Sequence, residues 1–102
     1  MITLIIRFTA KQGGEQAFAA AARRVVENTR ANDDCIEFTV LQDKENPREF
    51  VLFERWKDEA SLAAHAARLK ALREAGDETA AEVPSLGSFA EHTVRGSYEV
   101  IA

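Results

Sequence analysis

Three side chains with chemistry of their own lie close together in the stretch Glu49–His65. His65 is one of only two histidines and Trp56 is the only tryptophan. Glu54 is a carboxylate on a strand face that is otherwise apolar. Histidine titrates near neutral pH, so it suits general acid-base catalysis. A tryptophan ring can stack on a planar ligand while its indole N–H orients a ligand oxygen. If this protein has a chemical site, we expect it here.

His65 and Trp56 each have a structural explanation as well. His65 follows Leu62 by three positions and precedes Leu69 by four, which places it on the apolar face of a helix. There it is either a hydrogen-bonded core residue or a base that takes a proton from a bound phenol. Trp56 is either a buried core or interface aromatic or a wall of a pocket.

Glu54 shares a strand face with Trp56, because the two are separated by one residue. If that face is buried, the carboxylate needs a partner or a raised pKa. We expect Arg7, on a strand that could lie alongside, to be that partner. The pair is either a structural ion pair or an acid-base group beside the pocket. For His92 and Tyr98, the pattern leaves open whether they reach the cavity or an interface.

The sequence indicates neither a metal nor a cofactor. One cysteine and two distant histidines give no metal-ligand spacing. Glycine-rich phosphate loops, dinucleotide fingerprints and Ser-His-Asp elbows are also missing from the sequence. Cys35 is expected to be a small buried residue rather than a nucleophile.

Length, charge and cysteine content narrow the class of protein. A chain of 102 residues is the size of a single domain, residues 1–102. Its formal net charge of −4 argues against nucleic acid as a partner. A single cysteine fits a reducing compartment, and the short N-terminal apolar run, which contains Arg7, fits neither a signal peptide nor a membrane span. We therefore expect a cytoplasmic protein without a membrane partner.

The pattern of apolar residues predicts two helices between strands. Alternation predicts strands, and helical spacing predicts helices. The expected strands are Ile2–Ala10, Cys35–Asp43 and Glu49–Trp56. Ser88–Val94 and Ser97–Ile101 are expected to form either one last strand that bends near Gly96 or two short strands. The expected helices run from Glu15 to about Arg30 and over Asp58–Ala81, the second capped by Asp58 and kinked or divided at Gly76.

This order, β-α-β-β-α-β, is that of a ferredoxin-like α+β fold, with an antiparallel sheet covered by helices on one face. The other face also carries large apolar residues: Ile5, Leu41, Val51 and Phe53. A small sheet cannot leave that many apolar groups in water. We therefore expect this face to meet a second copy of the chain, giving a homodimer.

The chain resembles the antibiotic biosynthesis monooxygenase family of dimeric α/β-barrel proteins, which includes quinol monooxygenases. The resemblance covers nearly the whole chain. Its pieces are the strand Ile2–Phe8, the turn Lys11–Glu15 with Phe18, Cys35, the strand Phe50–Trp56, Ala60 and Ala64-His65. Leu41–Asp43 and Lys57–Glu59 also look like relatives that process the signal molecule autoinducer-2.

The resemblance implies oxygenation of a small planar aromatic, such as a quinol or polyphenol, by O₂ without a metal or flavin. His65 would be the base and Trp56 the wall that positions the substrate. The substrate-binding residues would be Glu54, Arg7, Phe38, Leu52 and Leu69.

The sequence departs from the family pattern at several positions. Relatives often carry a second His and an aromatic where this chain has Lys70 and Ala71. Some have an Asn at the position of Leu52, and the haem-degrading branch has one near the end of the first strand, where Arg7 and Phe8 stand here.

Two alternatives remain open. One is a ligand-binding dimer without catalysis, in keeping with Lys70 and Ala71. The other is an isomerase of a small phosphorylated sugar-like signal, which would need Arg68, Lys70 or Arg73 to face the cavity. Otherwise these three cations form a solvated helix face.

Overall fold

The computed structural model describes residues 1–75 and 83–102, which form the predicted order of strands and helices. The strands are β1 (Ile2–Ala10), β2 (Cys35–Gln42), β3 (Glu49–Trp56) and β4 (Ala90–Tyr98). The helices are α1 (Glu15–Asn32) and α2 (Glu59–Glu74), and a short 3₁₀ turn, Leu86–Phe89, leads into β4. The expected ferredoxin-like α+β fold is confirmed.

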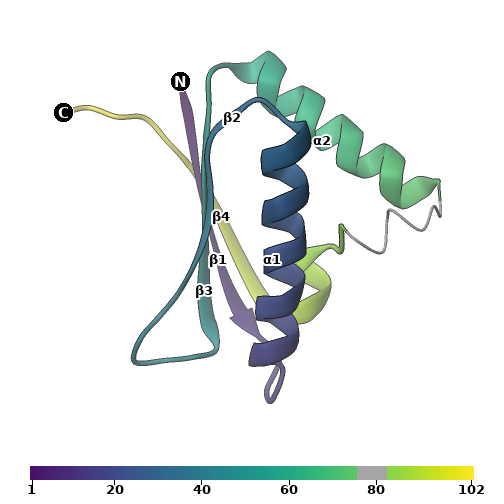
Figure 1. Ribbon diagram of the computed structural model, residues 1–102. Coiled ribbons are helices and arrows are strands. Elements are labelled where there is room, and N and C mark those ends of the chain that lie inside the picture. The colour runs from purple at the N-terminus through teal and green to yellow at the C-terminus, as the bar shows by residue number, and fades with distance from the viewer. Residues whose placement is uncertain (76–82) are drawn as a thin grey trace.

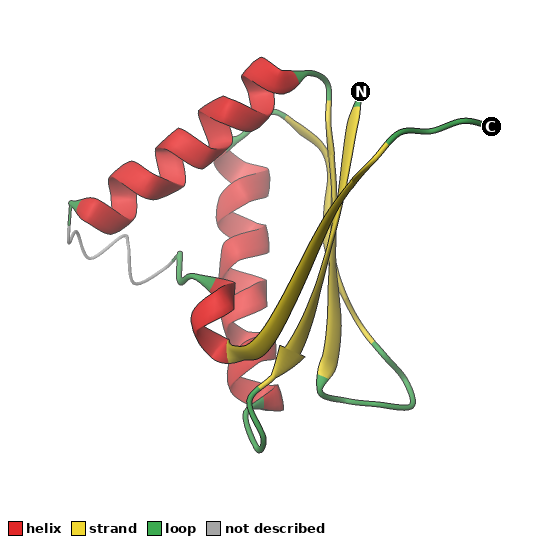
Figure 2. Cartoon of the chain, turned by 180° about the vertical axis from the view of Figure 1, so that it is seen from behind, coloured by secondary structure: helices red, strands yellow, loops and turns green. Residues whose placement is uncertain are grey.

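The four strands form one antiparallel sheet in the order β2-β3-β1-β4. Both helices lie on one side of this sheet, and the other side is bare (Figures 1 and 2). The register sets Leu4 opposite Glu54 and Ile6 opposite Arg95. Since side chains alternate along a strand, these four residues share the helix-covered face.

Local sequence explains where the helices begin. Gly13 has a φ of 76°, a left-handed conformation that glycine adopts without strain, and it ends the turn after β1. Helix α1 then follows through a run of strong helix formers. Helix α2 begins after Asp58, whose side chain accepts a hydrogen bond from the Ser61 backbone N–H at 2.8 Å. This confirms Asp58 as the helix cap.

The core lies between α1 and the sheet. Phe18 of α1 stacks on Phe50 of β3 with ring centroids 4.3 Å apart, and it also contacts Phe8 of β1 at 5.2 Å. Buried aromatic pairs at such distances contribute about 0.5–1.5 kcal/mol beyond their area burial. They fix α1 firmly on the sheet. Helix α2 instead slants away from the sheet toward its C-terminal end (Figure 2).

The bare face of the sheet is rich in apolar side chains. Leu41, Val94 and Tyr98 are about half exposed, at 55%, 51% and 49%. Ile5 and Phe53 lie among them as direct partners in the β1–β3 pairing. The predicted apolar face therefore exists, and a second copy of the chain on it remains a prediction.

The last strand differs from the expectation. Instead of bending near Gly96 and continuing to Ile101, β4 runs without interruption from Ala90 to Tyr98. Gly96 pairs with Ile5, and the Tyr98 ring lies over Gly96, where a Cβ atom would come within 2.5 Å of the Tyr98 hydroxyl oxygen. The glycine makes room for this ring, so it does not mark a bend.

The predicted extension of the second helix beyond Glu74, with its kink at Gly76, falls on residues 76–82 and lies outside the described residues. Helix α1 ends two residues later than expected, and β2 one residue earlier. Among the described residues, neither helix is both long and apolar enough to span a membrane.

Candidate functional site

A cavity of about 560 Å³ lies between helix α2 and the β1, β3 and β4 strands. It exists because α2 slants away from the sheet while α1 packs tightly on it (Figure 1). The apolar lining is contributed by two strand residues and three helix residues: Leu4, Ile6, Leu62, Ala66 and Leu69. The polar lining consists of Glu54, His65, Lys70, Arg73, Glu74 and Arg95. A concave site that combines apolar surface with convergent polar groups is typical of small-molecule binding.

A carboxylate from the end of helix α1 holds His65 in place. Asp33 is the C-cap residue of α1, and its Oδ2 atom lies 2.6 Å from His65 Nδ1. Arg68 donates to both oxygens of Asp33, at 2.8 and 2.7 Å. His65 and Arg68 can share this partner because residues three apart lie on one face of a helix. Since Asp33 occupies Nδ1, a ligand in the cavity meets the imidazole through Nε2.

The charge state of Asp33 follows from its two partners. Burial alone would raise its pKa, but the hydrogen bonds from Arg68 and His65 outweigh burial and hold the pKa of Asp33 below its usual value. Its side chain is only 7% exposed. An ionised carboxylate on Nδ1 fixes the orientation of the ring and stabilises the imidazolium that forms when Nε2 accepts a proton.

Glu54 is the second acid of the site, and it is 4% exposed. Burial raises its pKa, while the Trp56 hydrogen bond and the charges of His65 and Arg95 counteract part of the rise. The Trp56 indole N–H donates to Glu54 Oε1 at 3.0 Å. The expectation that a buried Glu54 needs a partner or a raised pKa is therefore met in both ways.

Trp56 is fully buried behind these polar groups. Its ring lies 4.7 Å from that of His65 and 6.3 Å from that of Phe38, centroid to centroid. It supports the imidazole on one side and Glu54 on the other. Trp56 thus backs the cavity through His65 and Glu54, which are the groups that line it.

The seven residues expected at the site fall into three groups. His65, Glu54 and Leu69 line one cavity. Trp56, Phe38 and Leu52 lie in the core behind it, 0%, 2% and 5% exposed. Arg7 pairs with Val51 and lies on the opposite, bare face of the sheet.

The predicted Glu54–Arg7 ion pair is wrong, because the two side chains lie on opposite faces of the sheet. Glu54 pairs with Leu4 of β1, which is three positions before Arg7. Because side chains alternate along a strand, Glu54 and Arg7 point to opposite faces of the sheet. Trp56 is the hydrogen-bond partner instead. The sequence pattern identified the face of Glu54 but not the register of β1.

The cations of α2 are not equivalent. Arg68 is bound to Asp33. Arg73 donates to the backbone oxygens of Val83 and Pro84 at 3.2 and 3.1 Å, which ties the end of α2 to the segment that leads to β4. Lys70 is exposed, and its Nζ atom lies 3.9 Å from Glu74 Oε1. Lys70 and Arg73 line the cavity, whereas Arg68 serves the Asp33 cluster.

Sequence reasoning missed Asp33 and Arg95. Asp33 falls in a polar turn, Asn32-Asp33-Asp34, which predicts the end of a helix and carries no signal of a contact with the second helix. Arg95 stands in an alternating strand, and its face became clear only with the register to β1. The Asp33–His65 contact and the pairing of Arg95 with Ile6 both join residues distant in sequence, so local periodicity does not predict them.

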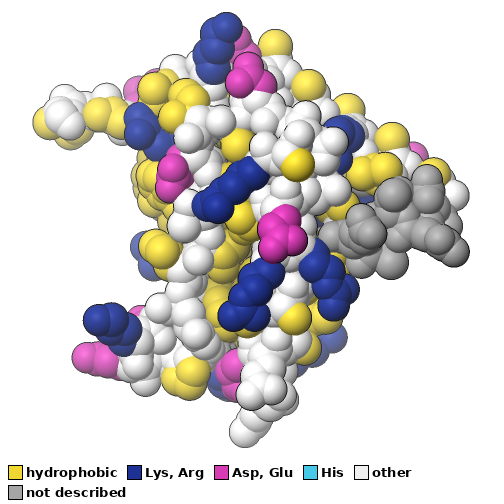
Figure 3. Space-filling model, in the orientation of Figure 1, with side chains coloured by type: hydrophobic (Ala, Val, Ile, Leu, Met, Phe, Trp, Pro, Cys, Tyr) yellow, Lys and Arg dark blue, Asp and Glu magenta, His cyan; other side chains and the backbone are white. Residues whose placement is uncertain are grey.

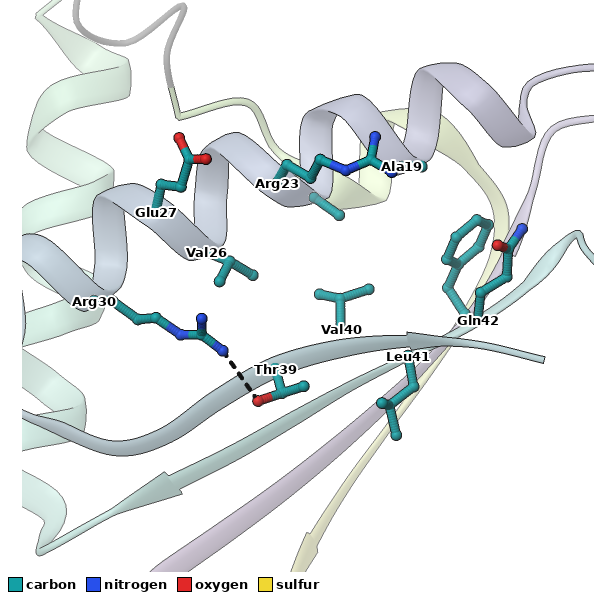
Figure 4. Close-up of a pocket in the computed structure, with 11 residues that line it drawn as sticks. Ala19, Arg23, Val26, Glu27, Arg30, Thr39, Val40, Leu41 and Gln42 are labelled. Carbon is teal, nitrogen blue, oxygen red and sulfur yellow. Dashed lines mark hydrogen bonds between the residues drawn. The ribbon is translucent and has the colours of Figure 1, made fainter. Parts of the chain in front are cut away.

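A second hollow of about 450 Å³ runs between helix α1 and the edge strand β2 (Figure 4). Val26 and Val40 face each other across it, and Arg30 donates to the Thr39 hydroxyl at 3.3 Å. Figure 3 shows it as an apolar strip bordered by charged side chains. None of the seven expected residues lines this groove.

Within residues 1–75 and 83–102, no group of three or more His, Cys, Asp or Glu side chains is placed to hold a metal ion. The titratable groups that line the cavity can take part in proton transfer. His65 can accept a proton, and Glu54 can hold one.

Solved structures share this fold along the whole chain. A crystal structure described as an antibiotic biosynthesis monooxygenase has a TM-score of 0.77 at 22% identity, with 100% of both chains covered. A protein from Pseudomonas aeruginosa has a TM-score of 0.75 at 22% identity, covering 99% of this chain and 94% of that one. A conserved protein from Methanosarcina mazei Go1 has a TM-score of 0.72 at 26% identity, covering 95% and 89%.

Among curated proteins, none matches this sequence. The family model for antibiotic biosynthesis monooxygenase, however, matches residues 1–75. This range includes both helices, the first three strands and the whole Asp33–His65–Arg68 cluster. The chain belongs to the antibiotic biosynthesis monooxygenase family.

Proposed function

We propose that this protein binds a planar phenol, such as a quinol or polyphenol, in the cavity under α2 and oxygenates it with O₂. His65 is the base, acting through Nε2. The observation that carries the proposal is His65 in the wall of this cavity, with its Nδ1 atom 2.6 Å from Asp33 Oδ2. Family membership supports the reaction class.

The cavity suits a small aromatic ligand. Its volume of about 560 Å³ falls within the range typical of small-molecule sites. Leu4 and Ile6 offer a flat apolar floor on the sheet, and Leu62 and Leu69 offer a roof on α2. Phe38, Leu52 and Trp56 act from behind this lining, where they hold its shape.

The reaction begins with a proton transfer. Nε2 of His65 takes the phenolic proton, and Asp33 stabilises the imidazolium. The electron-rich phenolate then reduces O₂, and a carbon–oxygen bond forms at the ring. After His65 returns its proton to the distal oxygen, the O–O bond breaks and the ring carbon loses its hydrogen as a proton. One oxygen stays on the ring as a quinone carbonyl, the other leaves as water, and the phenol supplies all four electrons.

Glu54 favours this reaction as long as it stays protonated. Burial raises its pKa and so favours the protonated form, which places no second negative charge beside the phenolate. A carboxylate there would oppose ionisation of the substrate, because like charges at close range repel. The indole N–H of Trp56 keeps the acid oriented.

We further propose that the working form is a cytoplasmic homodimer joined through the bare face of the sheet. The half-exposed Leu41, Val94 and Tyr98 support this. Arg7 lies on the same face, so its expected role in substrate binding gives way to a place at this interface.

Isotope labelling tests the reaction. Protein dialysed against a chelator is supplied with ¹⁸O₂ and a panel of hydroquinones and naphthols. We expect one labelled oxygen in the product quinone and one in water. If ligands bind, as seen in calorimetry, and no member of the panel consumes O₂, the oxygenase proposal is wrong, and a ligand-binding dimer without catalysis takes its place.

A further inference from the structure

We propose that Arg95 makes this cavity selective for phenols that carry a carboxylate group. The selectivity rests on the proposed function, because it concerns the same cavity. Arg95 stands on β4 opposite Ile6, on the helix-covered face, and it lines the cavity together with Glu54 and His65. Arg95 is not among the site residues predicted from the sequence.

The strands of Arg95 and Glu54 flank β1, so the two residues border the cavity from opposite sides. Strand β1 lies between the strands of Glu54 and Arg95. The residues of β1 that pair with them, Leu4 and Ile6, are two positions apart. With about 4.8 Å between strands and 3.3 Å per residue, the two Cα atoms lie about 12 Å apart. The floor between them is made by Leu4 and Ile6 of β1. A substituted aromatic ring can lie on this floor with one end at each polar group.

The charges of the cavity favour an anionic ligand. Three cations line it, Lys70, Arg73 and Arg95, although the chain as a whole has a net charge of −4. Of its two carboxyl groups, Glu54 is buried and Glu74 is paired with Lys70. The cavity therefore carries an excess of positive charge on an acidic protein.

Arg95 is the cation best placed to meet that anion. Arg73 is occupied by the backbone oxygens of Val83 and Pro84. In the described part of the chain, no carboxylate oxygen lies within ion-pair distance of the Arg95 guanidinium. A guanidinium binds a carboxylate through two parallel hydrogen bonds, which are stronger and more directional than neutral ones.

Matched acids and esters test this selectivity by binding alone. Anaerobic calorimetry would compare 2,5-dihydroxybenzoate and 1,4-dihydroxy-2-naphthoate with their methyl esters, on the full chain. We expect at least one acid to bind wild-type protein about 10-fold or more tighter than its ester. In Arg95→Gln this ratio should fall to about 1. Arg24 is an exposed arginine on α1 that does not line the cavity, so the ratio in Arg24→Gln should stay as in wild type.

The proposal is overturned if neither acid binds wild-type protein more tightly than its ester, including the case of no binding. It is also overturned if the preference persists in Arg95→Gln. Because no turnover is involved, an Arg95-dependent preference in a protein that consumes no O₂ would reject the oxygenase and keep the acid-selective site.

Discussion

At the scale of single residues, the site depends on two buried acids whose pKa values are shifted in opposite directions. Asp33 is ionised because Arg68 and His65 surround its carboxylate, and burial favours the protonated form of Glu54. An ionised group next to Nδ1 prepares His65 to accept a proton at Nε2. The protonated form of Glu54, which burial favours, carries no charge that would oppose the phenolate. Acids whose environments push their pKa values apart are typical of catalytic sites.

We expect Asp33→Asn to lower the free energy of unfolding by about 3 kcal/mol near neutral pH, since it breaks a buried charged network. The pKa of Asp33 is lowered in the folded protein, so its stabilisation is complete above the unfolded value near 3.8 and is lost as pH falls through the folded value. Urea titrations from pH 7 to pH 3 should show a steeper loss in wild type than in the variant.

The neighbouring Asp34→Asn is the matched control, because Asp34 is exposed and has the same change of charge. It should leave stability within about 0.5 kcal/mol of wild type. Equal stabilities of the Asp33 and Asp34 variants would contradict the role assigned to the cluster.

Glu54→Gln tests the second acid. The folded pKa of Glu54 lies above its ordinary value near 4.5, so the folded state binds the proton more tightly. Wild type should lose stability as pH rises from about 4.5 through the folded pKa. Glutamine still accepts the Trp56 hydrogen bond and cannot ionise, so the variant should be about 1 kcal/mol more stable than wild type at pH 8 and equal to it at pH 4.

Thermal unfolding across this pH range measures the difference. The exposed Glu45→Gln is the control and should follow wild type at each pH. A Glu54→Gln variant that follows the wild-type curve as well would show that Glu54 ionises normally in the folded protein.

At the scale of elements, two helix ends build the site. The C-terminal end of α1 supplies Asp33, whose backbone N–H caps the helix by donating to the Thr29 oxygen at 2.8 Å. The first turns of α2 supply His65, and that helix begins at its Asp58 cap. Anything that shifts either end moves Asp33 relative to His65.

Asp58→Ala should therefore destabilise the fold by about 1 kcal/mol through loss of the cap. For a domain of this size, the melting temperature should fall by about 4–8 °C. Lys57→Ala, one residue earlier and also exposed, is the control and should melt within about 2 °C of wild type. A cap variant that melts like wild type would mean that α2 is held by its packing alone.

Prediction from sequence succeeded where the signal is local. The alternation of apolar and polar residues predicted β1 and β3 with the first and last residues that the structure has. The expected cap at Asp58 predicted where α2 begins. Prediction from sequence failed where the answer depends on contacts distant in sequence. Arg7 and Glu54 lie on opposite faces because of the register between β1 and β3. The Asp33–His65 contact joins residues that are 32 positions apart.

At the scale of the whole molecule, the sheet has one side covered by helices and one side bare (Figures 1 and 2). The bare side presents half-exposed Leu41, Val94 and Tyr98. Burying such side chains in an interface yields roughly 25 cal/mol for each Å² of apolar area removed from water. In a two-fold dimer, the same surface patch of both subunits forms the interface.

Val94→Glu should therefore convert the dimer to a monomer, because a carboxylate buried in an apolar interface lacks a partner. Sedimentation velocity at micromolar concentration measures the change. Ala31→Glu introduces the same charge on the exposed end of α1 and should leave the dimer intact. A wild-type protein that sediments as a monomer would rule out this interface.

The role of His65 as base is tested most directly by oxygen uptake with a panel of quinols, in chelator-treated wild type and in His65→Asn. Asparagine can still donate a hydrogen bond to Asp33, so the fold and the cluster should survive, as circular dichroism would verify. His92→Asn, which changes the exposed histidine on the bare face, is the control. We expect kcat/KM to fall by about 10²-fold or more in His65→Asn and to stay near wild type in His92→Asn. A folded His65→Asn variant that consumes O₂ as fast as wild type would contradict the account.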